Sequence, residues 1–115
     1  MTIRELTDAD LMVIEPGKRL TLANAQELIS AVQSLPRGVA PTIVVNMEHV
    51  EVVDSAGIGS MVKAQKYIQG IGGTFCLASL RPEIRRMFQM MNLHQVFEMY
   101  ETVELARKHF SARRV

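Results

Sequence analysis

The stretch VDSAGIG, residues 53–59, joins a short β-branched segment to the start of a predicted helix. Asp54 or Ser55 can cap that helix, and the glycines allow its first turn to pack closely against a neighbouring segment. Gly70 is predicted to end the helix by adopting a left-handed backbone conformation. The expected inward side chains are Ile58, Met61, Val62 and Ile68, and the expected outward ones are Lys63 and Lys66. This stretch therefore predicts a strand-to-helix connection, the unit from which α/β domains are built.

Two strands and a helix are expected before this stretch. Residues 3–6 and the apolar run at 11–14 indicate a strand pair around a turn at 8–10, and the unbroken run is typical of a strand covered on both faces. Thr21 is placed to cap a helix that continues until Pro36 interrupts it. The apolar positions that keep a helical period are Ala25, Leu28, Ile29, Val32 and Leu35.

Three further strands are predicted, at residues 43–45, 74–78 and 96–100. The first is expected in the centre of the sheet, because β-branched residues dominate it. Strands that alternate with helices imply right-handed crossovers and a largely parallel sheet. The predicted fold class is therefore α/β, with a mixed, mostly parallel sheet of four to five strands.

Two more helices complete the prediction, so that about four helices accompany the sheet. Pro82 is expected at the first position of the third helix and Asn92 at its end. Its predicted inward residues are Ile84, Met87, Phe88 and Met91. Thr102 is expected to cap a closing helix whose inner residues are Val103, Ala106 and Phe110.

Composition limits the functional classes. The 115 residues suit one domain, and 13 basic against 12 acidic side chains leave +1, which gives no electrostatic reason to expect nucleic acid or a membrane as partner. The lone Cys76 excludes an internal disulfide or a multi-thiolate metal site. No segment approaches the roughly 20 apolar residues of a membrane helix, and the N-terminus lacks a signal-peptide apolar region. We expect a cytoplasmic protein.

Motifs for catalysis are not found in the sequence. The three histidines are far apart, and none belongs to a metal-ligand spacing. In the dinucleotide-binding pattern Gly-x-Gly-x-x-Gly, the position of the third glycine is occupied by Val62. Ser60 lacks the two flanking glycines of the nucleophile elbow found in serine hydrolases. We therefore expect no enzyme, no cofactor and no metal.

Ser55 carries the functional interpretation. A serine at a helix start holds its hydroxyl near unpaired backbone N–H groups and the positive end of the helix dipole. Such a hydroxyl could carry a phosphate without unfolding the helix. The alternative is that Ser55 or Asp54 serves only as a helix cap.

Three motifs in order, VDSAGIG (53–59), IGG (71–73) and LRPEIRRMF (80–88), resemble the STAS family, specifically the small bacterial anti-sigma-factor antagonists. The resemblance runs from about residue 5 to residue 107 and implies a single STAS domain over residues 1–115, with its core at about 3–110. It implies a binding module that captures an anti-sigma factor, itself a serine kinase of the histidine-kinase-like ATPase type. The resemblance further implies that this kinase would phosphorylate Ser55 and so end the capture, and that a metal-dependent serine phosphatase would restore the hydroxyl.

The expected partner-binding face surrounds Ser55. Its members are Lys18, Arg19, Thr21, Asp54, Ala56, Gly57, Ile58 and Met61. Relatives commonly have a second Ser or Thr at position 56, and an aspartate shortly after Gly17, where this chain has Lys18 and Arg19. These two cations suggest the hypothesis that the protein partly tolerates the phosphate.

Two other functions stay open. A constitutive STAS scaffold, within a lipid-transport or stress-sensing assembly, would use Ser55 only as a helix cap. A nucleotide-using hydrolase is the enzyme alternative, but the sequence lacks a base, a metal cluster and a complete phosphate loop for it.

Overall fold

Five strands form the main sheet of the computed structural model, which describes residues 1–6, 11–35 and 40–113. The strand order is β1-β2-β4-β6-β7. β1 pairs antiparallel with β2, and every other neighbouring pair is parallel, which confirms the predicted mixed, mostly parallel sheet. The strands are β1 (Thr2–Leu6), β2 (Leu11–Glu15), β4 (Thr42–Asn46), β6 (Thr74–Ala78) and β7 (Glu98–Tyr100).

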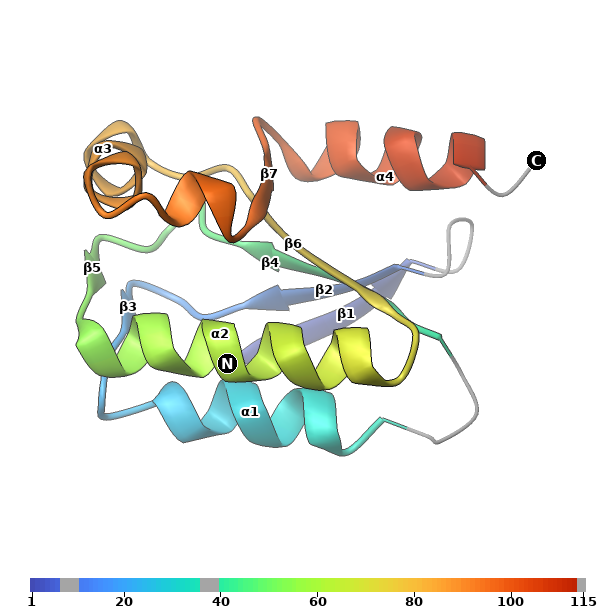
Figure 1. Cartoon of the computed structure of the whole chain (residues 1–115), viewed down its shortest axis with the longest axis horizontal. Coiled ribbons are helices and arrows are strands. Elements are labelled where there is room, and N and C mark those ends of the chain that lie inside the picture. The colour runs from blue at the N-terminus through green and yellow to red at the C-terminus, as the bar shows by residue number, and fades with distance from the viewer. Residues whose placement is uncertain (7–10, 36–39, 114–115) are drawn as a thin grey trace.

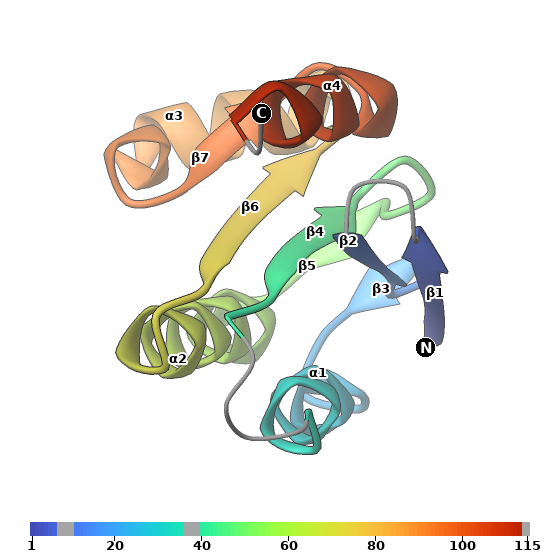
Figure 2. The same cartoon turned by 90° about the vertical axis from the view of Figure 1, so that its right-hand side faces the viewer.

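Helices cover the sheet on both sides. α1 (Ala25–Gln33) and α2 (Ser55–Gly70) lie side by side along one face, and α4 (Val103–Arg113) lies along the other (Figures 1 and 2). α3 (Pro82–Met90) lies beyond the end of β6 (Figure 1). In the described parts of the chain, no helix has both the length and the apolar character needed to cross a membrane.

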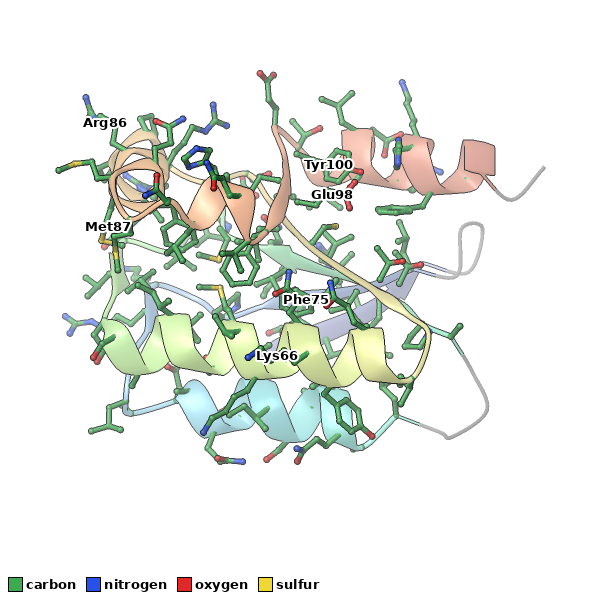
Figure 3. All side chains as sticks on the ribbon, viewed as in Figure 1. Lys66, Phe75, Arg86, Met87, Glu98 and Tyr100 are labelled. Atoms are coloured by element: carbon green, nitrogen blue, oxygen red, sulfur yellow. The ribbon has the colours of Figure 1, made fainter. Side chains whose placement is uncertain are left out.

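Each face of the sheet has its own apolar cluster, because successive strand residues point to opposite sides. The larger cluster lies between the sheet and α1 and α2, and Figure 3 shows Phe75 there. The smaller one is formed where Ala106 and Phe110 of α4 pack against Val44 and Cys76. Burial on both sides explains why the central strands are unbroken apolar runs.

A second, two-stranded parallel sheet consists of β3 (Arg19–Leu20) and β5 (Val52–Val53). It lies beside the starts of α1 and α2, at the end of the main sheet (Figure 1). The backbone N–H of Glu51 extends the pairing by donating to the Lys18 carbonyl at 2.7 Å. This small sheet brings two segments from distant parts of the chain to the start of α2.

The predicted cap of α1 is wrong. The helix begins at Ala25 with Asn24 in the N-cap position, and the Thr21 hydroxyl accepts a long bond from the Ala23 N–H, at 3.4 Å, before the helix starts. The turn predicted at residues 8–10 and the proline at 36 lie outside the described residues.

Later boundaries also differ from the prediction. Gly70 is the last residue of α2, and the left-handed conformation belongs to Gly72, with φ 84°. Met91 is 52% exposed and follows the end of α3, so it does not point inward as predicted. A short 3₁₀ helix (Leu93–Gln95) precedes Val96, and the last strand therefore starts at Glu98.

Candidate functional site

The start of α2 is capped by Asp54, whose two carboxylate oxygens hold two different segments. Oδ1 accepts the Gly57 N–H at 2.8 Å, the usual arrangement of an N-cap. Oδ2 accepts the Leu22 N–H at 3.0 Å, from the loop between β3 and α1. These backbone N–H groups lower the pKa of Asp54, with Gly57 contributing most and Leu22 next. One ionised side chain therefore fastens the β3–α1 loop to α2.

Ser55 is the first residue of α2 and is exposed. Among the described residues, no hydrogen-bond partner is found for its hydroxyl. Ser60, in the next turn of the same helix, is buried and donates to the Gly57 carbonyl at 2.7 Å. The two serines thus differ in access, and only the Ser55 hydroxyl is open to an incoming protein.

Gly57 brings α2 into direct contact with β3. A Cβ built on Gly57 would lie 2.0 Å from the Leu20 carbonyl oxygen, a distance that no side chain can occupy. A Cβ on Gly59 would meet no atom within 4 Å. The predicted role of the glycines in close packing is therefore confirmed for Gly57 and wrong for Gly59.

The β3–α1 loop is held by its own hydrogen bonds. The Thr21 N–H donates to Asn24 Oδ1 at 2.9 Å, and Asn24 Nδ2 donates to the Arg19 carbonyl at 2.8 Å. Between these contacts, the Leu22 side chain is 79% exposed. The sequence analysis missed Leu22, although Asn24 three residues after Thr21 is a local signal for such a loop.

The remaining residues of the expected partner-binding face are only partly at the surface. Lys18 and Arg19 are exposed, whereas Thr21, Ala56 and Ile58 are half-buried. Two members are corrected. Met61 has no exposed surface, because the helical period places it against the sheet, and Gly57 is buried against Leu20.

A separate hollow of about 480 Å³ lies at the ends of β4, β6 and β7, beside the start of α4. Arg4, Glu48, Ser79 and Glu101 contribute to its lining, whereas Ser55 does not. Within residues 1–6, 11–35 and 40–113, no group of three or more metal-ligating side chains occurs. The candidate site around Ser55 is an exposed helix start and is separate from this hollow.

The fold and motifs together match a known family. A family model described as the STAS domain matches residues 2–106. This chain belongs to the STAS domain family. The predicted resemblance is confirmed by this match.

Two Thermotoga proteins are similar to this STAS domain over most of their length. A Thermotoga neapolitana protein named as a candidate anti-sigma factor antagonist is 27% identical over 106 residues, covering 90% of this chain and 93% of that protein. A Thermotoga maritima protein with a similar name is 29% identical over 99 residues, covering 84% and 87%.

Solved structures share the fold. The crystal structure of a candidate anti-sigma factor antagonist from Thermotoga maritima superposes with a TM-score of 0.80 at 24% identity, covering 95% of this chain and 92% of that one. SpoIIAA, an anti-sigma factor antagonist of Bacillus, superposes in its unphosphorylated form with a TM-score of 0.66 at 20% identity, covering 91% of each chain. Its phosphorylated form gives the same score at 21% identity, covering 94% and 98%.

Proposed function

We propose that this STAS domain is an anti-sigma factor antagonist that captures an anti-sigma factor while Ser55 is unmodified and releases it when Ser55 is phosphorylated. The observation that carries the proposal is the exposed hydroxyl of Ser55 at the first residue of α2. The names of the Thermotoga relatives support the antagonist function, and the two solved forms of SpoIIAA support the switch. In this proposal Ser55 is modified by an enzyme and does not itself catalyse a reaction.

The surface around Ser55 is suited to receive a protein in the unmodified state. Ile58 follows three residues later on α2 and is half-buried, and Val52 of β5 is 42% exposed. Such small apolar areas beside a neutral hydroxyl can be covered by a partner at little desolvation cost.

Phosphorylation changes this surface electrostatically. A phosphate adds a charge of about −1.5 to −2 and strong acceptor oxygens. The ionised Asp54 is adjacent and repels it, while the N–H groups of the helix start partly offset the repulsion. Covering the phosphate with a partner that lacks a matching cation costs far more than covering a hydroxyl. Binding is therefore disrupted locally, and the fold is retained.

The proposed partners are an anti-sigma factor that is also a kinase, of the histidine-kinase-like ATPase type, and a metal-dependent serine phosphatase. The exposed side chains of Lys18 and Arg19 have no ion-pair partner among the residues described. They are thus available to approach a phosphate at the neighbouring helix start, which would make release incomplete. Phosphorylated protein should then bind the kinase more weakly when both cations are replaced by alanine, and an unchanged affinity would reject this role.

The test incubates the protein with ATP and each histidine-kinase-like ATPase encoded in the same genome, and maps phosphate by mass spectrometry. We expect label on Ser55 in the wild type and no label in Ser55→Ala. Ser60 is an internal control, because its buried hydroxyl is occupied by the Gly57 carbonyl. Association should be strong before labelling and weak after it.

One result would reject the switch. Tight association that ATP does not change, with Ser55 unlabelled, would instead favour the constitutive scaffold, in which Ser55 is only part of a helix start.

A further inference from the structure

Leu22 has a large apolar side chain that is exposed to solvent. It lies on a loop whose backbone is fixed by hydrogen bonds. Isolated exposed leucines are common on protein surfaces, so its 79% exposure alone indicates nothing. What distinguishes Leu22 is that its N–H is bound to Asp54, and that the backbone of Thr21 and Arg19, just before it, is bound by the Asn24 side chain. A loop ordered before binding loses little conformational entropy when a partner covers it.

The charges next to Leu22 indicate the chemistry of the partner. Lys18 and Arg19 precede it in the sequence, Arg19 being the first residue of β3, and both are exposed. Two acids lie nearby: Glu51, just before β5, is exposed, whereas the half-buried carboxylate of Asp54 is occupied by two backbone N–H groups. The exposed charges are therefore two cations and one acid. A complementary surface would present acidic side chains around an apolar pocket.

We propose that Leu22 is the apolar anchor with which the unmodified protein binds its anti-sigma factor, in a partner pocket with an acidic rim. This inference rests on the proposed function and adds an anchor on a segment 32 residues away from Asp54 in the sequence. Asp54 is the positioning residue, because its carboxylate holds the Leu22 backbone. A phosphate on Ser55 competes with that carboxylate for the N–H groups of the helix start and repels it, which loosens the Leu22 loop.

The anchor is tested by measuring the affinity of Leu22→Ala for the histidine-kinase-like ATPases encoded in the same genome. Burial of a leucine side chain predicts a weakening of about 10- to 100-fold. Leu105→Ala is the matched control, because Leu105 is 46% exposed on α4 and its N–H also donates to a side-chain oxygen, Thr102 Oγ1 at 3.0 Å. The control should bind as the wild type does.

The outcomes separate the two proposals. If Leu22→Ala binds as tightly as the wild type while phosphorylation of Ser55 still ends binding, the anchor is wrong and the switch stands. If the wild-type protein does not associate with any of these ATPases, the proposed function fails, and the anchor fails with it.

The positioning role of Asp54 is tested on the protein alone by amide hydrogen exchange. Asn is also a good N-cap but has only one side-chain acceptor oxygen, so Asp54→Asn can keep the Gly57 bond and must lose the bond to Leu22. We expect the Leu22 N–H to exchange about tenfold faster or more in this variant, and in protein carrying phosphoserine at position 55. Gly57 should stay protected in Asp54→Asn. Unchanged exchange at Leu22 in both proteins would refute the coupling.

Discussion

Replacing Gly57 with alanine is expected to separate the start of α2 from β3. The new Cβ would lie 2.0 Å from the Leu20 carbonyl oxygen and 2.8 Å from its carbonyl carbon. These are backbone atoms of a strand, so they cannot rotate aside as a flexible side chain would, and overpacking should reach the upper part of its usual range, about 3 kcal/mol. Alanine recovers at most about 1 kcal/mol of helix propensity over glycine. Gly57→Ala should therefore lower the free energy of unfolding by about 2 kcal/mol.

Urea denaturation followed by circular dichroism measures this difference, with Gly59→Ala as the matched control in the same helix. A Cβ at Gly59 has no atom within 4 Å, so this variant should gain about 1 kcal/mol from helix propensity alone. The two variants should therefore differ by about 3 kcal/mol although they are two residues apart. If Gly57→Ala were as stable as the wild type, the close packing of α2 on β3 would be wrong.

Three further changes have definite expected results. Thr102→Ala removes the oxygen that accepts the Leu105 N–H and should lower the free energy of unfolding in urea by about 1 kcal/mol; an unchanged midpoint would contradict the cap. Burial raises the pKa of Cys76 to about 12, so a thiol reagent at pH 8 should label the unfolded protein and not the native one. Because the folded-state pKa of Asp54 lies below its ordinary value of 3.8, its stabilising bonds persist above that pH and are lost as the pH falls through the lower value. The amide NMR shifts of Gly57 and Leu22 should titrate together below pH 3.8, and a midpoint above it would refute the assignment.

The layered α/β fold could be predicted because its signals are local. The strand at Thr74–Ala78 is an apolar run buried on both faces, and Pro82 starts α3 at the position where its missing N–H is not needed. No local sequence pattern predicted the pairing of β3 with β5 in the small sheet. Its strands have two residues each, and their pairing depends on contacts between Leu20, Gly57 and Asp54 that form only in the folded chain.

The candidate site was predicted in part. Ser55 lies at a helix start as expected, because the residues that begin α2 are adjacent in the sequence. Met61 was placed on the partner-binding face wrongly. It has no exposed surface, whereas Ile58, on the same face one turn nearer the helix start, is half-buried. Leu22 was missed because no pattern within residues 53–59 refers to a loop more than 30 residues earlier.

The bond between Leu22 and Asp54 joins residues 32 positions apart, and this separation limits what a synthetic peptide can reproduce. A peptide copying residues 52–60 would contain Ser55 but neither Leu22 nor the β3 strand against which Gly57 packs. A newly synthesised chain likewise lacks this surface until both segments have been made and have paired. A partner that binds the proposed surface would therefore recognise only the folded protein, and misfolded copies would not compete for it.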